Sequence, residues 1–263
     1  MNTVIVIPAR KGSTRFPNKP LALIRGQPLL YRTWLIAKKV QSVDEVYVTT
    51  DDEQIRVKAE SFGAKVIMTR PECSNGTERV YEAIRQLKVR PTIALNLQGD
   101  AVLTPPWVIQ SVIETLKQDP SIPLATPAIR LDWKRYDEFV QTKAGGKISG
   151  TLVVFDLKQN ALYFSKGLIP LMRDRKIAEP PIFRHIGLYA YRYETLEKYV
   201  QLAPTPLEEV EKLEQLRALE NGIPIKIVLV DYRGRTHGSI DNPEDVQVVE
   251  SIIDREGELA ECS

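Results

Sequence analysis

The sequence predicts an α/β fold built on a mostly parallel sheet, and two observations carry this prediction. Over the first 120 residues, apolar runs rich in β-branched side chains alternate with segments of helical periodicity, the pattern of β-α-β units. The first apolar run, residues 4–7, ends in a loop of Pro, Gly, Ser and Thr, as a buried strand does. The 263 residues, 43% hydrophobic and 27% charged, suffice for one large domain or one domain with a subdomain.

The order of the elements follows from these patterns. Strands are expected at residues 4–7, 45–50, 65–68 and 92–97, and helices between them at 28–40, 53–62 and 76–87. From about residue 120, extended segments at 123–131, 151–155 and 185–192 follow without helices between them, which predicts an antiparallel section. Helices return at 206–220 and 243–256 with a strand at 225–230 between them, and residues 143–149 and 174–181 are expected to be surface loops.

The loop after the first strand is strongly basic. It carries Arg10, Lys11, Arg15 and Lys19, and residues 1–43 contain eight Lys and Arg but no Asp or Glu, in a chain whose net charge is only +2. Open α/β sheets bind ligands at the carboxyl ends of their strands, so this loop is suited to a polyphosphate rather than to nucleic acid. Its single glycine excludes both the Walker A loop and the dinucleotide fingerprint. An ordinary solvated surface loop is the alternative interpretation.

Two acidic residues stand where a metal bound to a polyphosphate would need oxygen ligands. Asp100 follows the apolar strand at residues 92–97, which places it in the same crevice as the basic loop. A simple Gly-Asp turn is the alternative there. Asp241 precedes Pro243 at the start of a predicted helix, so the local sequence suits a helix cap as well as a metal ligand.

Two polar segments are candidates for contacts with the rest of a ligand. Residues 74–79 form a polar turn that enters a helix, where Asn75 and Glu78 are typical of a capping box and a surface that reads a base or sugar is the alternative. Arg184 and His185 begin the last extended segment, although a lone histidine in a strand is more often a packed residue than a ligand contact.

The composition excludes several other classes of protein. No apolar run approaches the roughly 20 residues of a membrane span. The N-terminal apolar stretch leads directly into Pro8 and Arg10, unlike a signal peptide. Cys73 and Cys262 offer neither a disulfide framework nor metal spacing, and only two histidines are present, so no zinc site is expected. The sequence therefore predicts a cytoplasmic protein that binds neither membrane nor nucleic acid.

Seven sequence blocks together resemble the 3-deoxy-manno-octulosonate (Kdo) cytidylyltransferase family, the CMP-Kdo synthetases. In chain order they are Pro-Ala-Arg-x-x-Ser-Thr-Arg-x-Pro-x-Lys-Pro-Leu from residue 8, Ser-x-Gly-Thr-Glu-Arg from 74, Asn-x-Gln-Gly-Asp from 96, Ala-Leu-Tyr-Phe-Ser from 161, Arg-His-x-Gly-x-Tyr-x-Tyr-Arg from 184, Leu-Glu-Gln-Leu-Arg from 213 and Asp-x-Pro-Glu-Asp from 241. The blocks span nearly the whole chain, and they are specific as a set.

The resemblance implies a nucleotide-diphospho-sugar transferase-like fold, a Rossmann-like mixed sheet with an inserted antiparallel dimerisation portion. It implies a single domain, residues 1–263, with the nucleotide and metal core at about 1–120 and 206–256 and the acceptor and dimerisation portion at about 121–205. The implied reaction transfers CMP from CTP to the anomeric hydroxyl of Kdo or a Kdo-like acidic sugar and releases pyrophosphate, with Mg²⁺ as cofactor, in a homodimer.

The resemblance also assigns residues by motif. Lys19, Arg15 and Asp100 would be catalytic, and Asp100 and Asp241 would ligate Mg²⁺. The residues implied to bind the nucleotide are Ala9, Arg10, Lys11, Gly12, Ser13, Arg15, Lys19, Ser74, Arg79 and Gln98. The residues implied to bind the acceptor are Gln98, Arg184, His185, Tyr189, Glu214 and Gln215.

Three positions depart from the family pattern in regions implied to lie near the acidic sugar. Ala101 stands where the family usually has Glu, Leu152 where many members have Lys, and Lys166 where Arg is usual. Lysine lacks the planar fork with which arginine grips a carboxylate. The alternatives to Kdo are therefore an amino-Kdo, another ulosonic acid or a phosphonate, and a nucleotide-binding protein that has lost turnover is an alternative to an enzyme.

Overall fold

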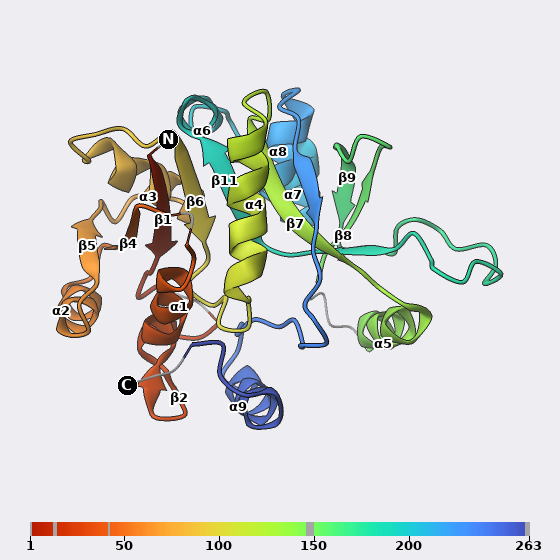
Figure 1. Cartoon of the computed structure of the whole chain (residues 1–263), viewed down its shortest axis with the longest axis horizontal. Coiled ribbons are helices and arrows are strands. Elements are labelled where there is room, and N and C mark those ends of the chain that lie inside the picture. The colour runs from red at the N-terminus through yellow and green to blue at the C-terminus, as the bar shows by residue number, and fades with distance from the viewer. Residues whose placement is uncertain (1, 13–14, 42, 146–149, 261–263) are drawn as a thin grey trace.

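The computed structural model describes residues 2–12, 15–41, 43–145 and 150–260, which form a central sheet covered by helices on both faces (Figure 1). The strands lie in the order β5-β4-β1-β6-β11-β7-β10-β8-β9, and β12 pairs with β7. They are β1 (Thr3–Pro8), β4 (Glu45–Thr50), β5 (Lys65–Met68), β6 (Ile93–Leu97), β7 (Leu124–Arg130), β8 (Leu152–Phe155), β9 (Ala161–Ser165), β10 (Phe183–His185), β11 (Leu188–Arg192) and β12 (Lys226–Leu229). A separate two-stranded sheet joins β2 (Leu23–Ile24) to β3 (Gln27–Pro28).

The alternation of side chains along β1 explains the two helical layers. Ile5 and Ile7 face one hydrophobic cluster, shared with α1, α2 and α4, whereas Val4 and Val6 face the other, shared with α3, α6 and α8. The helices are α1 (Leu29–Lys38), α2 (Glu53–Ser61), α3 (Gly76–Arg85), α4 (Pro106–Gln118), α5 (Trp133–Ala144), α6 (Tyr193–Tyr199), α7 (Pro206–Glu211), α8 (Gln215–Glu220) and α9 (Asp245–Glu256), with the short 3-10 helix η1 (Lys19–Leu21).

One half of the sheet is parallel, as the sequence predicts. β1 pairs in parallel with β4 and with β6, and β4 pairs in parallel with β5. The carboxyl ends of these strands consequently meet at one edge, and the basic loop leaves β1 there. The strands predicted at residues 45–50 and 65–68 are confirmed to the residue.

The other half is mostly antiparallel, with β12 paired in parallel to β7 as the exception, and this mixed sheet confirms the predicted fold class. β11 runs antiparallel to β6 and β7, and β10 runs antiparallel to β7 and β8. The expectation that no helix interrupts this section was wrong, because α5 lies between β7 and β8. Asp132 caps α5 by accepting a hydrogen bond from the backbone of Arg135 at 2.8 Å, and Tyr136 and Phe139 bury one face of it. α4 and α6 were not predicted either.

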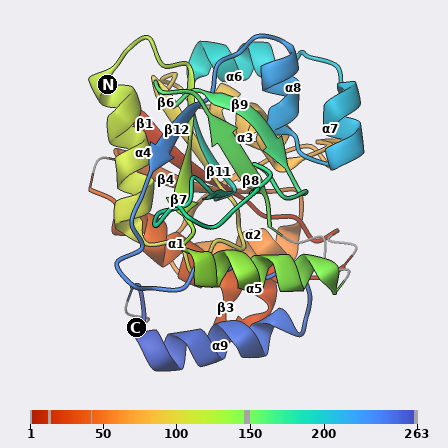
Figure 2. The same ribbon diagram turned by 90° about the vertical axis from the view of Figure 1, so that its right-hand side faces the viewer.

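Two long elements expected from the sequence are each divided. The segment at 185–192 is two strands, because β10 pairs with β8 whereas β11 pairs with β6. The helix at 206–220 is broken between α7 and α8 at Lys212, whose left-handed backbone (φ 54°) ends α7. Seen from the side (Figure 2), α5 and α9 lie at the same end of the molecule and α6 at the other. Residues 146–149 of the expected loop at 143–149 lie outside the described residues, and Lys143 belongs to α5.

None of the helices in the described part of the chain combines the length and apolar character that a membrane span requires.

Candidate active site

Two ion pairs join the basic loop to the two predicted metal acids. Lys19 Nζ donates hydrogen bonds to Asp100 Oδ2 at 2.5 Å and to the carbonyl of Ile240 at 2.9 Å. Arg15 Nη2 donates to Asp241 Oδ1 at 2.8 Å. The Lys19 and Asp100 side chains are 18% and 23% exposed, whereas that of Arg15 is 66% exposed. Three segments far apart in the sequence therefore meet at the carboxyl edge of β1 and β6.

A glycine permits the close approach of the strand ends at this edge. A Cβ atom on Gly99 would lie 3.0 Å from the carbonyl oxygen of Pro8, so a larger residue would require the backbone of Pro8 to shift. The carbonyl of Gly99 also accepts a hydrogen bond from Thr33 Oγ1 at 3.0 Å. The Gly-Asp pair thus serves packing as well as placing Asp100 next to the basic loop.

The helix-capping alternative for Asp241 was wrong. α9 begins at Asp245 rather than at residue 243, and Asp245 Oδ2 accepts the backbone hydrogen bonds of Asp241 and Asn242, both at 2.8 Å. Asp245 thus closes the turn before the helix, and the Asp241 carboxylate pairs with Arg15 instead.

A cavity of about 300 Å³ lies between the basic loop, the start of α3 and the end of β6. Of the residues implied to bind the nucleotide, seven line this cavity, and both predicted metal acids line it as well. The lining residues from the two sets are Ala9, Arg10, Arg15, Lys19, Ser74, Arg79, Gln98, Asp100 and Asp241. The structure adds Asn75 and Gly76, which the sequence placed in the same block without assigning them to the site.

The remaining nucleotide-binding residues are not in the lining. Lys11 turns onto α2, where its Nζ lies 3.2 Å from Gln54 Oε1 and 3.4 Å from Asp52 Oδ2. Gly12 lies in the loop outside the cavity wall, and Ser13 falls outside the described residues.

Arg79 is both a wall residue and a structural one. Its side chain is 2% exposed, and its guanidinium donates to Thr69 Oγ1 at 2.7 Å and pairs with Asp51 at 3.0 Å. The ion pair fixes the carboxyl end of β4 against α3, so Arg79 shapes the cavity through packing.

The turn at residues 74–79 forms the predicted helix cap. Asn75 Oδ1 accepts a hydrogen bond from the backbone of Glu78 at 2.9 Å, and Glu78 Oε2 accepts one from the backbone of Ser74 at 2.8 Å. Since Ser74 and Asn75 also line the cavity, capping and a place in the site coexist.

A second cavity, of about 270 Å³, adjoins the first. The two linings share Gln98, Asp100 and Asp241. Of the residues implied to bind the acceptor, five line this second cavity: Gln98, Arg184, His185, Tyr189 and Gln215. Two compartments therefore meet at the two carboxylates, one rich in cations and the other reaching toward β10 and β11. No sequence pattern pointed to Thr104, Thr151 and His237, which also line the second compartment.

Glu214 is not part of that lining. Its carboxyl is buried and accepts a hydrogen bond from Thr77 Oγ1 at 2.9 Å, and burial raises its pKa. Thr77 in turn accepts from Asn96 Nδ2 at 3.1 Å, and Asn96 Oδ1 accepts from Gln98 Nε2 at 3.3 Å. Glu214 is therefore connected to the wall that the two cavities share only through this series of hydrogen bonds. The series uses the amide nitrogen of Gln98 and leaves the amide oxygen of Gln98 available for other contacts.

His185 is held in one neutral form. Burial lowers its pKa to about 3. Its Nε2 lies 2.9 Å from Thr126 Oγ1, which donates its own hydrogen to the carbonyl of Leu188 at 2.7 Å. Because that hydroxyl hydrogen is used, His185 Nε2 carries the proton and Nδ1 is an acceptor.

The three departures from the family pattern lie in different surroundings. Ala101 lines the second cavity. Leu152 is fully buried in an apolar cluster with Tyr136 and Phe139. A lysine at this position would bury its ammonium group among apolar side chains. Lys166 lies outside the cavity lining, and its backbone nitrogen donates to Glu211 at 2.9 Å. Only Ala101 is therefore placed to touch an acceptor.

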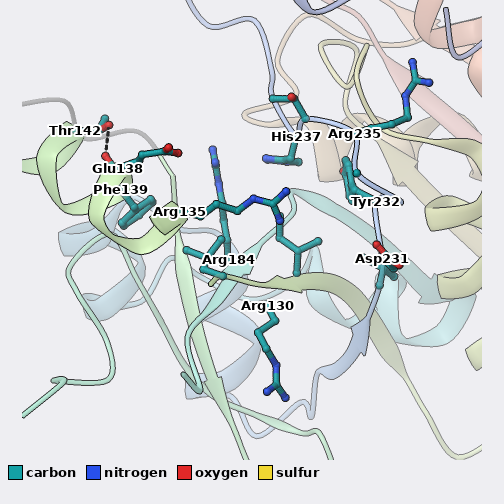
Figure 3. A pocket seen from close by; sticks show the side chains of 15 residues that line it. Arg130, Arg135, Glu138, Phe139, Thr142, Arg184, Asp231, Tyr232, Arg235 and His237 are labelled. Atoms are coloured by element: carbon teal, nitrogen blue, oxygen red, sulfur yellow. Dashed lines mark hydrogen bonds between the residues drawn. The ribbon is translucent and has the colours of Figure 1, made fainter. Parts of the chain in front are cut away.

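A third cavity, larger than these two at about 580 Å³, lies beside the second one and is shown in Figure 3. This outer pocket shares Arg184 and His237 with the second cavity and contains neither Asp100 nor Asp241. Since the paired carboxylates and the basic loop are absent from it, its size does not make it the reaction site.

Comparisons with known proteins agree with this geometry. A family model described as cytidylyltransferase matches residues 4–227. A 3-deoxy-manno-octulosonate cytidylyltransferase of Maricaulis maris is 53% identical over 259 residues, which cover 98% of this chain and 100% of that protein. An 8-amino-3,8-dideoxy-manno-octulosonate cytidylyltransferase of Shewanella sediminis is 38% identical, covering 96% of this chain and 99% of that protein. A solved structure of CMP:2-keto-3-deoxy-manno-octonic acid synthetase complexed with CTP has a TM-score of 0.85 at 34% identity, covering 97% of this chain and 100% of that one.

The fold, the basic loop and the paired carboxylates define a nucleotidyltransferase. More narrowly, the chain belongs to the cytidylyltransferase family and, within it, to the 3-deoxy-manno-octulosonate cytidylyltransferases that its sequence blocks resemble.

Proposed function

We propose that this chain transfers CMP from CTP to the anomeric hydroxyl of Kdo or a Kdo-like acid and releases pyrophosphate. The observation that carries the proposal is the pair of cavities that share Asp100 and Asp241. A reaction between two substrates needs two compartments that meet at the reacting atoms, and these compartments meet at two carboxylates.

The cation-rich cavity suits the triphosphate of CTP. Arg10, Arg15 and Lys19 all line it, and two of these cations already hold carboxylates at hydrogen-bonding distance. A triphosphate entering the cavity would compete for the same cations, so the ion pairs to Asp100 and Asp241 keep the loop in place until the nucleotide replaces them.

The two carboxylates also suit Mg²⁺ when substrate is present. Mg²⁺ is bound in nucleotide enzymes by one or two carboxylates together with phosphate oxygens and water. No group of three or more metal-ligating side chains occurs among the described residues, which fits this mode better than an all-protein cage. Asp100 and Asp241 would hold the ion, and the ion would supply charge neutralisation at the phosphates.

The chemistry requires positioning rather than a covalent intermediate. The anomeric hydroxyl loses its proton, its oxygen forms a bond to the α-phosphorus, and the bond from that phosphorus to the bridging oxygen breaks as pyrophosphate leaves. Lys19 and Arg15 counter the charge that collects on the phosphates, and Gln98 lies on the wall common to both substrates.

Kdo is the acceptor that the relatives favour. The Maricaulis maris protein, named for Kdo, is 53% identical, whereas the Shewanella sediminis protein, named for the 8-amino sugar, is 38% identical. The cavity suits an acid of this class because the Arg184 cation lines it together with His185. Ala101, which lacks the family's usual carboxylate at that wall, keeps the amino sugar, another ulosonic acid and a phosphonate as alternatives.

The quaternary structure and compartment stay predictions. Leu157, Leu162 and Leu171 on the antiparallel part are exposed, but single apolar side chains are ordinary on a protein surface, so the expected homodimer rests on the family resemblance. The cytoplasmic location rests on the composition of the chain, whose two cysteines offer no disulfide framework.

A panel of acceptors tests the proposed function. Pyrophosphate release is measured with CTP, Mg²⁺ and each of Kdo, 8-amino-Kdo, another ulosonic acid and a phosphonate. We expect release with Kdo and its abolition by EDTA. CTP binding without pyrophosphate release for any acid would instead support a nucleotide-binding protein without turnover.

A further inference from the structure

The outer pocket has no role in the reaction described above, yet it borders the acceptor compartment. It lies between α5, the adjoining ends of β7 and β10, and the segment at residues 230–237. Its lining has no residue in common with the nucleotide cavity, and it shares Arg184 and His237 with the acceptor cavity. Any group held there would therefore touch the acceptor site through these two side chains.

Four arginines line the outer pocket, and two of them are engaged elsewhere. Arg130 pairs with Glu179 at 2.8 Å, and Arg235 donates to the carbonyl of Gly257. In Figure 3 both point away from the cavity, whereas Arg135 and Arg184 extend across it toward His237. Among the described residues, Arg135 forms a long ion pair with Asp132, in which Nε and Oδ2 lie 4.0 Å apart.

Arg184 has no counter-ion in the part of the chain that the structure describes. Its Nε is buried and has no hydrogen-bond partner among these residues, and the same holds for Nδ1 of His237. Burial lowers the pKa of the Arg184 guanidinium, and Tyr232 acts in the opposite direction. A buried charge that lacks a partner is costly, so a site that keeps one is suited to an anion that arrives with a ligand.

His237 adds a hydrogen-bonding group without adding charge. Burial, with Arg184 and His185 nearby, lowers its pKa to about 3, so the imidazole is neutral near pH 7. Tyr232, 5% exposed, packs edge-on against this ring at 5.6 Å and fixes it at the pocket wall.

The acidic residues of the pocket do not neutralise its centre. Glu138 and Asp231 also line it, but both are exposed to solvent, where water and salt screen their charges. Asp231 Oδ1 in addition accepts a hydrogen bond from the backbone of Arg233 at 2.7 Å.

We propose that the outer pocket is an oxyanion site, in which Arg135 and Arg184 bind a phosphate or carboxylate group and His237 hydrogen-bonds to it. Guanidinium groups match the planar or tetrahedral oxygens of such groups with paired hydrogen bonds. The group is either carried on the acceptor, at the end far from the anomeric carbon, or it is a free anion that modulates acceptor binding. The acceptor arm of this inference rests on the proposed function, whereas anion binding itself does not.

A binding titration tests the site without turnover. Inorganic phosphate is titrated calorimetrically into the wild type, Arg135→Gln, Arg130→Gln and Lys19→Met. Phosphate at the outer pocket binds about 10-fold more weakly to Arg135→Gln, since a charge-assisted contact is lost. Arg130→Gln is the matched control, because Arg130 lines the same pocket but points away, and its affinity stays at the wild-type value. Lys19→Met separates this site from phosphate bound at the basic loop and keeps the Arg135-dependent binding.

Steady-state kinetics with saturating CTP then distinguish the two sources of the anion. For a group carried on the acceptor, Kdo phosphorylated at its far end has a higher kcat/KM than Kdo, and Arg135→Gln removes this preference. For a free anion, added phosphate changes the KM for Kdo in the wild type and in Arg130→Gln but not in Arg135→Gln.

The proposal is overturned if phosphate affinity and both kinetic responses are the same in Arg135→Gln as in the wild type. If no acid is turned over at all, the proposed function fails and the titration alone decides. Thermal unfolding of each variant verifies that the substitutions at the exposed Arg130 and Arg135, and at the part-buried Lys19, leave the fold intact.

Discussion

Lys19 donates a 2.5 Å hydrogen bond to Asp100, a residue 81 positions away in the sequence. The pair links the loop that is suited to the triphosphate with a carboxylate that is suited to its metal. A second hydrogen bond of Lys19, to the carbonyl of Ile240, connects both to the segment that carries Asp241. One lysine thus holds together the parts that the proposed reaction needs in one place.

Replacement of Lys19 by methionine tests this role. Lys19→Met keeps the apolar stem and removes the ammonium, so kcat/KM for CTP is expected to fall on the order of 100-fold. The loss of a partner for the part-buried Asp100 carboxylate lowers the free energy of unfolding by about 1 kcal/mol. Lys38→Met, an exposed position on α1, is the control and leaves both quantities unchanged. Wild-type kinetics in Lys19→Met would remove this lysine from the mechanism.

The two carboxylates are tested by their amides. Asp100→Asn and Asp241→Asn are each expected to cut turnover roughly 100-fold or more, because an amide oxygen neutralises Mg²⁺ poorly, and to raise the Mg²⁺ concentration needed for half-maximal rate. Asp156→Asn, in a turn outside the described cavities, keeps the wild-type rate. If either site variant retained the wild-type rate and Mg²⁺ dependence, its carboxylate would not be a metal ligand.

Arg79 is expected to matter more for stability than for nucleotide contact. Arg79→Met leaves the Asp51 carboxylate without its buried partner, so the free energy of unfolding drops by about 3 kcal/mol. The double variant with Asp51→Asn recovers part of this loss, because the unpaired charge is then gone. Chemical denaturation of the wild type, the two single variants and the double variant measures this double-mutant cycle. Strictly additive losses would show that the two side chains do not act as a pair.

The two histidines predict how stability depends on pH. Burial lowers the pKa of both His185 and His237 to about 3, whereas a histidine in the unfolded chain titrates near its ordinary 6.5. Below pH 6.5 the unfolded chain therefore binds protons that the folded protein does not, and stability falls as the pH drops from 6.5 toward 3. Each histidine accounts for a loss of about 2 kcal/mol between pH 7.5 and 5.

Denaturation at these two pH values measures the effect. His185→Gln is expected to have a weaker pH dependence than the wild type, by about the contribution of one histidine. A variant whose stability fell as steeply as that of the wild type would show that His185 titrates normally in the folded protein.

The convergence of Lys19 and Asp100 could be foreseen because parallel strands end at a common edge. The strand patterns at residues 45–50 and 65–68 were equally clear, since each is an apolar run bounded by polar turns. The resemblance then assigned Asp241 to the same crevice as a metal ligand. The local sequence alone was compatible with both a metal ligand and a helix cap at this position.

Other features depend on contacts that no local pattern encodes. α5 was missed because its buried side chains, Tyr136 and Phe139, pack against a small cluster beyond β7 and leave most of the helix polar. Glu214 belongs to one of the sequence blocks that resemble the family. Its carboxyl is nevertheless buried, where it accepts a hydrogen bond from Thr77. The outer pocket exists only because α5 and the segment at residues 230–237 are brought together, so its arginines had no common pattern in the sequence.

The central claim is tested most directly by following phosphorus in a single reaction. CTP, Kdo and Mg²⁺ are incubated with the protein, and the products are resolved by ³¹P NMR. For the proposed transfer we expect equal amounts of pyrophosphate and of a new phosphodiester that joins CMP to the anomeric oxygen of the acid, with neither formed when Mg²⁺ is chelated. Release of free CMP with no phosphodiester, or no loss of CTP by a protein that binds it, would rule out the transfer of CMP to the acid.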